Sequence, residues 1–394
     1  MKVIFLYLIF FITFSSCVAQ KPYTFVKNPQ IFIENNKKII RGNKLLNSAK
    51  MELVNEANKI LKKRELYSVT FKSQLPPSNS KSDYYSMAPY WWPDETKKDG
   101  TPYIRKDGKV NPESQQITDS YMLGSISTDV YKLGLAYFYT QDEKYIKWIN
   151  ELIDVFFINS ETKMNPHFNY AQLIPGRKRS EGGSITIGSV SFIRLLEGVQ
   201  FVKHSKEFDN AQLYELKQWF SDFVSWMEND NAPKIESKAQ NNIGVYYTAQ
   251  LVTYHLFIGN EAKAKNILET QGKYIVDKQV SHDGALKAEL KRATPWSYVR
   301  YTLTAFDYLV ALSDILDVDL YYYTNAEGGS IDKMYRWLIP YAESKEEWTY
   351  SDEKPSPRQM QKTLLRSNIV NYKTKVMNKD VGLNYLEILT NSIY

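Results

Sequence analysis

The sequence predicts an all-α protein built from antiparallel helical hairpins packed in one layered array. Along most of the chain, apolar residues recur at steps of three and four, as they do on one face of a helix. The sequence lacks a series of alternating strands, two-residue hairpin turns and the spacing of βαβ units. Short turns join most of the periodic segments, which favours antiparallel neighbours.

The clearest helical pattern lies at residues 209–229, where Leu213, Leu216 and Phe220 begin one apolar stripe. The same spacing recurs along the chain and predicts the remaining helices. They are expected near residues 45–65, 117–139, 141–158, 186–206, 244–258, 260–279, 297–316, 330–343, 357–370 and 380–392.

Length and charge restrict the class of protein. The 394 residues, 43% of them hydrophobic and 24% charged, fit a globular chain with ample core material. We expect one domain over residues 20–394 and a monomer. The net charge of +6, from 50 basic and 44 acidic residues, is mild and evenly spread. It suits an acidic substrate and is too weak to indicate a nucleic-acid partner.

The N-terminus has the pattern of an export signal. In MKVIFLYLIFFITFSSCVAQ, one lysine precedes an apolar run that ends in small residues. We expect a signal peptide over residues 1–19 and a periplasmic or secreted protein. The alternative is a lipoprotein anchored at Cys17, the one cysteine of the chain. No later segment reaches the roughly 18 unbroken apolar residues of a membrane span.

Three long connections, near residues 70–116, 159–185 and 281–296, hold most of the proline, glycine, asparagine and histidine. Long irregular segments in a compact helical domain are usually functional. The stretch YYSMAPYWW at 84–92 places flat aromatic rings among prolines, in a segment expected at the surface. Such rings can stack on sugars while amides and arginines bind hydroxyls or carboxylates. A scaffold role also fits each segment taken alone.

Several well-known catalytic signals are missing. The chain has no GxSxG, HExxH, phosphate-binding loop or CxxC motif. Its four histidines, His167, His204, His255 and His282, lie far apart in the sequence. We therefore predict no metal and no cofactor.

Four segments carry a resemblance to a known family. DYYSMAPYWWPDETKKDGTPYIRKDGKVNPE at 83–113 resembles the long signature of the alginate lyase superfamily. MNPHFNYAQLIPGR at 164–177, QNNIGVYYTAQ at 240–250 and ELKRATPWSYVRYTLTA at 289–305 are similar to three further family segments, in the same order. The resemblance covers about residues 80–310.

The resemblance implies an incomplete (α/α) toroid with long active-site loops. It also implies β-elimination on a polysaccharide that contains uronic acids, such as alginate or glucuronan. By motif position, the catalytic residues would be Tyr298, Arg292, Asn242 and Asn241. The neighbouring motif positions give the candidate substrate-binding residues: Tyr90, Trp91, Trp92, His167, Gln172, Arg177, Tyr246 and Tyr247.

The sequence departs from the family pattern at the position of the family's histidine, which is Ile243 here. One interpretation is that Tyr298 makes both proton transfers, which requires its pKa to fall below the ordinary value near 10. The other is a protein that binds uronates without cleaving them. His167 or His282 could replace the missing imidazole in space. We favour an active enzyme, because the tyrosine, the arginine and both asparagines are present.

A glycoside hydrolase on the same fold is the enzymatic alternative. It needs two carboxylates about 6.5–9.5 Å apart if inverting, or about 5–5.5 Å apart if retaining. Glu181, Asp283 and Glu289 lie in suitable segments. We expect Glu289 instead to orient Arg292, since the two lie three positions apart, about one turn of a helix.

Overall fold

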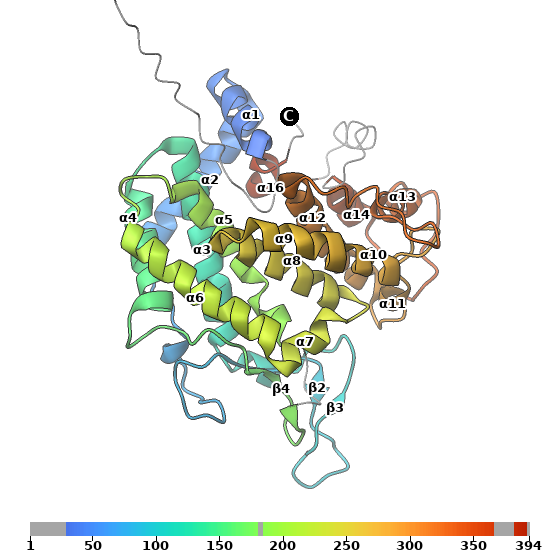
Figure 1. Ribbon diagram of the computed structural model, residues 1–394. Helices are drawn as coiled ribbons and strands as arrows, with labels where there is room; N and C mark the ends of the chain where they lie inside the picture. Colours follow the sequence, from blue (N-terminus) through green and yellow to red (C-terminus); the bar gives the residue numbers. More distant parts are fainter. Residues whose placement is uncertain (1–28, 180–183, 366–381, 392–394) are drawn as a thin grey trace, which may run out of the picture.

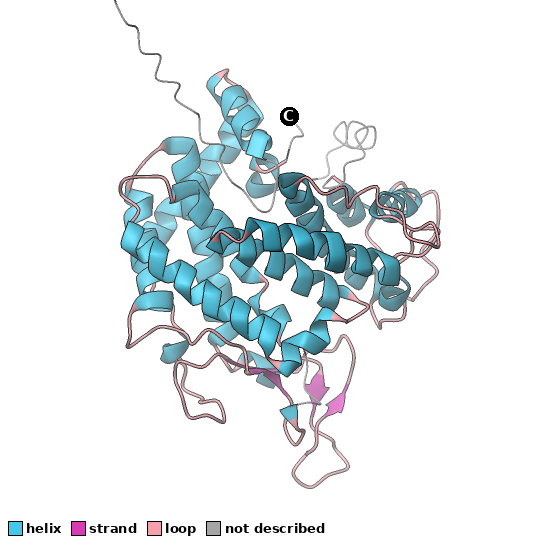
Figure 2. Cartoon of the chain, in the orientation of Figure 1, coloured by secondary structure: helices cyan, strands magenta, loops and turns pink. Residues whose placement is uncertain are grey.

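The computed structural model describes residues 29–179, 184–365 and 382–391, and this part is mainly helical (Figures 1 and 2). The expected signal peptide, Cys17 and Glu181 lie outside the described residues. The α-helices are α1 (Pro29–Ile40), α2 (Lys44–Lys63), α3 (Asp119–Thr140), α4 (Lys144–Ile153), α5 (Ser191–Val202), α6 (Asn210–Asn229), α7 (Asn231–Ser237), α8 (Asn242–Ile258), α9 (Glu261–Ile267), α10 (Lys273–Gln279), α11 (Lys287–Leu290), α12 (Pro295–Leu316), α13 (Ile331–Ala342), α14 (Pro357–Leu364) and α16 (Tyr385–Leu389).

The helices pack in layers around a shared core. Helix α3 packs against α2, α4 and α5, and helix α8 packs against α6, α9 and α12. Helix α8 is buried on nearly all sides, so its sequence is apolar around the whole circumference rather than along one stripe. The arrangement confirms the predicted all-α fold of helical hairpins.

Helices α3 and α5 pack closely against each other at two glycines. A Cβ atom on Gly134 would lie 2.3 Å from the carbonyl oxygen of Gly198, and one on Gly198 would lie 2.5 Å from that of Val130. Any larger residue at either position would force the two helices apart.

Two expected helices contain a single turn of π-helix, one in its middle and one at its C-terminal end. The segment 260–279 consists of α9, a π-turn at Leu268–Gly272 and α10. Helix α4 likewise continues into a π-turn at Asp154–Ile158. Helices α1, α7 and α11 were not expected from the sequence.

The long loops contain four short strands that the sequence analysis did not predict. Strand β1 (Tyr85–Met87) pairs in parallel with β4 (Tyr170–Leu173), and β2 (Trp91–Trp92) pairs antiparallel with β3 (Ile104–Arg105). The first pair joins the aromatic loop to the 159–185 connection. All four strands lie together at one end of the helical array, at the bottom of Figure 1.

A buried ion pair anchors this loop assembly to the helices. The Nζ atom of Lys72 lies 2.6 Å from Oδ2 of Asp119, and the two side chains are 1% and 0% exposed. The same oxygen accepts a hydrogen bond of 2.8 Å from the backbone N–H of Tyr85. Burial raises the pKa of Asp119 to about 6, although the charge of Lys72 opposes this rise. The pair thus ties β1 to the first turn of α3.

Candidate active site

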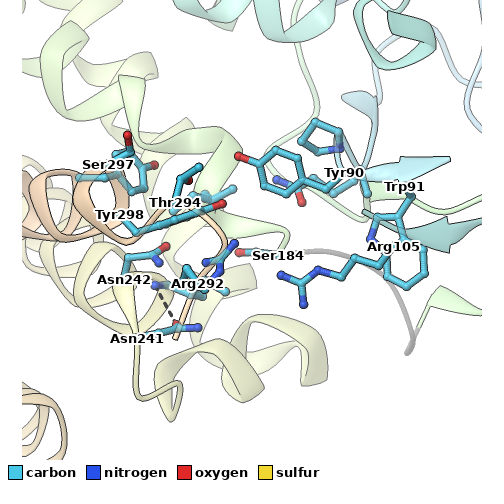
Figure 3. Close-up of a pocket in the computed structure, with 16 residues that line it drawn as sticks. Tyr90, Trp91, Arg105, Ser184, Asn241, Asn242, Arg292, Thr294, Ser297 and Tyr298 are labelled. Atoms are coloured by element: carbon cyan, nitrogen blue, oxygen red, sulfur yellow. Dashed lines mark hydrogen bonds between the residues drawn. The ribbon is translucent and has the colours of Figure 1, made fainter. Parts of the chain in front are cut away.

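A cleft of about 640 Å³ lies between the strand-bearing loops and the N-terminal ends of α8 and α12 (Figure 3). The loops contribute Tyr90, Trp91 and Arg105, whereas the helices contribute Asn241 and Tyr298, among others. Its size falls within the range of about 300–1,000 Å³ that is common for ligand pockets. The sequence motifs that lie far apart along the chain therefore meet in one place.

Tyr298 lies in the first turn of α12, which begins with proline at its first position. Its buried hydroxyl makes no hydrogen bond of good geometry with a described residue, and its nearest hydrogen-bonding neighbour is the side chain of Tyr90. Burial raises the pKa of Tyr298, the side chain of Tyr90 adds to the rise, and the charge of Arg292 opposes it. The pKa is therefore above its ordinary value, opposite to the fall that the sequence analysis required, and the free protein holds a neutral phenol at pH 7.

Arg292 is held by Asp107 and stacks on Tyr298. Its Nε and Nη2 atoms donate to the two carboxylate oxygens of Asp107 at 3.0 and 2.8 Å. Its guanidinium carbon lies 3.5 Å from the centre of the Tyr298 ring. The hydrogen bonds from Arg292 hold the pKa of the Asp107 carboxyl well below its usual range. Asp107 also accepts a hydrogen bond of 2.7 Å from Arg105 in its own loop, and its bonds to Arg292 link this loop to the segment that follows α11.

The expected partner of Arg292, Glu289, has a different role. Its carboxylate is 1% exposed and accepts from the backbone N–H of Asn242 at 2.6 Å and from its Nδ2 at 3.0 and 3.2 Å. Burial raises the pKa of Glu289, whereas the hydrogen bonds from Asn242 lower it. Glu289 therefore fixes the amide of Asn242, and Asp107 orients Arg292.

Asn241 caps helix α8. Its side-chain oxygen accepts from the backbone N–H of Ile243 at 3.1 Å, which leaves the Nδ2 group without a hydrogen-bond partner among the described residues (Figure 3). Ile243 also lines the cleft, beside Asn241 and Asn242. The adjacent asparagines thus differ in what they can offer to a ligand, since the Nδ2 group of Asn242 already donates to Glu289.

The aromatic loop divides its two tryptophans between different surroundings. Trp91 lines the cleft, and the guanidinium of Arg177 lies 4.7 Å from its ring centre. Trp92 is not among the lining residues, because successive residues of a strand point to opposite faces. Its indole N–H donates to the carbonyl of Lys109 at 2.9 Å. Gln172, at the end of β4, lines the cleft as expected.

Other expected substrate-binding residues lie away from the cleft lining. Tyr246 and Tyr247 are buried, and their hydroxyls donate to the carbonyls of Tyr301 and Met227. These two tyrosines therefore have a packing role in the free protein. Arg177 is not among the lining residues, and its Nε atom donates to the carbonyl of Tyr103 at 3.1 Å.

Neither histidine that could have replaced the missing imidazole lines the cleft. The Nε2 atom of His167 lies 3.2 Å from Oδ1 of Asp83. The backbone carbonyl of His282 accepts a hydrogen bond of 3.4 Å from Lys333 on α13. Among the described residues, the cleft lining contains no imidazole at all.

Four residues of the site were not predicted from the sequence: Asp107, Arg105, Thr294 and Tyr301. The last three of them line the cleft. A signal for two of them was present, since Arg105 and Asp107 belong to the first family-like segment.

Among the described residues, the cleft lining contains no carboxylate pair of the kind that a hydrolase needs, and Glu181 lies outside the described residues. Asp283 accepts from Ser281 and Ala285 within its own turn, and Glu289 is buried behind Asn242. Within the described ranges, no three His, Cys, Asp or Glu side chains are grouped to hold a metal ion. The described helices also include none long and apolar enough to cross a membrane.

Comparison with known proteins places the chain in a family. The sequence profile of the alginate lyase family matches residues 68–348. The chain belongs to the alginate lyase family. It is a polysaccharide lyase. Among curated proteins, none matches the chain.

Solved structures of alginate lyases have the same fold. An alginate lyase from Bacteroides ovatus matches with a TM-score of 0.81 and 31% identity, over 93% of this chain and 95% of that chain. Alginate lyase A1-III from Sphingomonas species A1 matches with a TM-score of 0.51 and 14% identity, over 84% and 88% of the two chains. A histidine-to-alanine variant of A1-III complexed with tetrasaccharide gives a TM-score of 0.55 at 14% identity, over the same shares. The expected helical toroid is thereby confirmed.

Proposed function

We propose that this polysaccharide lyase is exported and, as a monomer, cleaves a uronate-containing polysaccharide, alginate or a related polyuronate such as glucuronan, by β-elimination. The apolar leader supports export, with lipid anchoring at Cys17 as the alternative route. The observation that carries the chemistry is the constellation around Tyr298. Its buried hydroxyl makes no hydrogen bond of good geometry with a described residue, Tyr90 is its hydrogen-bonding neighbour, and Arg292 lies against its ring.

The reaction begins with removal of the proton at C5 of the uronate. The phenolate form of Tyr298 takes this proton, and the C4–O bond to the leaving sugar breaks as the C4=C5 double bond forms. The resulting neutral phenol then donates its proton to the leaving oxygen, which restores the phenolate. One tyrosine can serve as base and acid when both protons lie on the same face of the ring.

Negative charge develops on the uronate carboxylate as C5 loses its proton, so hydrogen-bond donors there lower the barrier. The Nη1 group of Arg292 and the Nδ2 group of Asn241 have no hydrogen-bond partner among the described residues. Both residues line the cleft. We therefore assign carboxylate binding to Arg292 and Asn241. The side-chain N–H groups of Asn242 already donate to Glu289, so this residue offers its side-chain oxygen as an acceptor for a substrate hydroxyl.

A uronate-binding protein without catalysis is the second candidate. It is favoured by Ile243 in the position of the family's histidine and by the lack of an imidazole among the described lining residues. Such a protein would bind uronate oligosaccharides and release nothing from them.

The test is a screen of the purified protein against uronic polysaccharides, including alginate and glucuronan, followed by ultraviolet absorbance of the conjugated double bond. A lyase produces this absorbance together with new chain ends. New reducing ends without the absorbance would mean hydrolysis, and binding without either product would mean a non-catalytic protein. Each of these last two outcomes would overturn the proposal.

A further inference from the structure

Helix α12 carries a row of accessible side chains that begins at the cleft and continues along the helix. Ser297, Arg300, Tyr301, Thr304 and Asp307 are all at least partly exposed, and their spacing of three and four places them on one face of the helix. From the first to the last of them, this face extends about 15 Å along the helix axis.

A second cavity, of about 290 Å³, follows this face directly after the catalytic cleft. It shares Ser297 and Tyr301 with the cleft, so the two spaces are neighbours along α12. Its other walls include Arg300 of α12 and Lys362 of α14. We call this space the middle cavity.

A third cavity, of about 380 Å³, continues in the same direction. It shares Thr304 and Glu387 with the middle cavity and adds Arg194 from α5. The three cavities therefore follow one another along α12, from the catalytic cleft to helix α16.

The middle cavity brings together two cations and one carboxylate. Arg300 donates from Nη1 to the neutral amide oxygen of Gln359 at 3.1 Å and from Nε to the hydroxyl of Thr363 at 3.4 Å. Lys362 lies 3.3 Å from the carboxylate of Glu387, and its side chain is 28% exposed. A guanidinium and an ammonium that line one space suit a bound carboxylate.

Tyr301 stands between the cleft and the middle cavity and is 40% exposed. Its ring packs against the buried ring of Tyr246, with 4.6 Å between the centroids. This contact holds an aromatic surface at the junction, where a sugar ring would pass from one space to the next.

We propose that the middle cavity is a subsite for a further uronate residue of the polymer, whose carboxylate is bound by Arg300 and Lys362. The path along α12 then carries the chain away from the catalytic cleft. This inference rests on the proposed function. Lys362 and Glu387 lie beyond residues 68–348, so the match to the family profile does not account for this part of the surface.

The experiment compares Lys362→Gln with the matched control Lys263→Gln. Lys263 on α9 also lies 3.3 Å from a carboxylate, that of Glu228, but it lies away from the three cavities. Initial rates are measured on the polymer that the wild type cleaves fastest and on the shortest oligosaccharide that it cleaves. Loss of a charged hydrogen bond should raise KM for the polymer about tenfold with kcat unchanged. KM for the short oligosaccharide should stay at the wild-type value, as should both constants of the control.

Two further variants make the result decisive. Arg300→Gln should reproduce the selective rise in KM, and Lys362→Arg should restore the wild-type value because it keeps the charge. An active wild type whose Lys362→Gln and Arg300→Gln variants keep the wild-type KM on polymer overturns the subsite alone. Equal losses on long and short substrates also overturn it, since they would place the effect in the catalytic centre. A wild type that forms no unsaturated product refutes the proposed function, and it refutes the subsite as well because the subsite depends on that function.

Discussion

Replacing Asp107 by asparagine removes the charge that orients Arg292 while it keeps the shape of the side chain. The carboxylate accepts two hydrogen bonds from Arg292 and one each from Arg105 and the backbone N–H of Ala293. An amide has only one acceptor oxygen and presents N–H donors to the second position. The guanidinium of Arg292 would therefore lose half of its bidentate contact and its fixed orientation on Tyr298.

The expected loss follows from these contacts. Hydrogen bonds to charged groups contribute about 1.5–3 kcal/mol, so losing one should lower kcat/KM about 10–100-fold. A second effect acts in the opposite direction, because the negative charge of Asp107 contributes to the raised pKa of Tyr298. Its removal should lower that pKa, so the rate should reach its plateau at a lower pH than in the wild type.

The assay is the initial rate of unsaturated product, measured across a pH series for wild type and Asp107→Asn. Asp332→Asn is the matched control, since Asp332 pairs with Arg336 at 2.7 Å on α13 and is similarly exposed, away from the cleft. Circular dichroism checks that both variants fold. Wild-type kcat/KM together with an unshifted pH profile in Asp107→Asn would refute the assigned role of the Asp107–Arg292 pair.

Three other outcomes are expected. Trp91→Ala should weaken binding of uronate oligosaccharides by about 1 kcal/mol, whereas Trp92→Ala, outside the lining, should leave it unchanged; calorimetry that shows equal losses would contradict this division. Glu289→Gln should lower kcat about tenfold or more, because it loosens the amide of Asn242, and an unchanged kcat in a folded variant would rule out this positioning. In the wild type, the raised pKa of Tyr298 means that the phenolate is the minor form at neutral pH, so kcat/KM should rise almost tenfold per pH unit from roughly pH 6 to 9. A pH-independent rate over that range would exclude a phenolate base.

The helices were predictable because their apolar spacing is a local property. The expected helix at 209–229 is α6, Asn210–Asn229. The strands were not predictable, since each has two to four residues and β1 pairs with a segment far along the chain, as in the Tyr85–Tyr170 pair.

The segments that line the candidate site were predictable from the sequence, whereas the contacts of their individual side chains were not. Glu289 was expected to support Arg292 across one helical turn, but α11 ends at Leu290, so the two residues share no helical face. Tyr246 and Tyr247 belong to a motif beside the cleft, yet α8 is buried all round and turns both of them inward. A motif places a segment near the site, whereas packing decides which side chains face the ligand.

The most direct test of the proposed mechanism is the Tyr298→Phe variant. This change removes the one hydroxyl that is assigned both proton transfers and keeps the ring against which Arg292 stacks. We expect the rate of unsaturated product to fall to background, while the affinity for a uronate oligosaccharide stays within about threefold of the wild type. A variant that binds the oligosaccharide and cleaves the polymer at the wild-type rate would contradict the assignment of Tyr298 as base and acid.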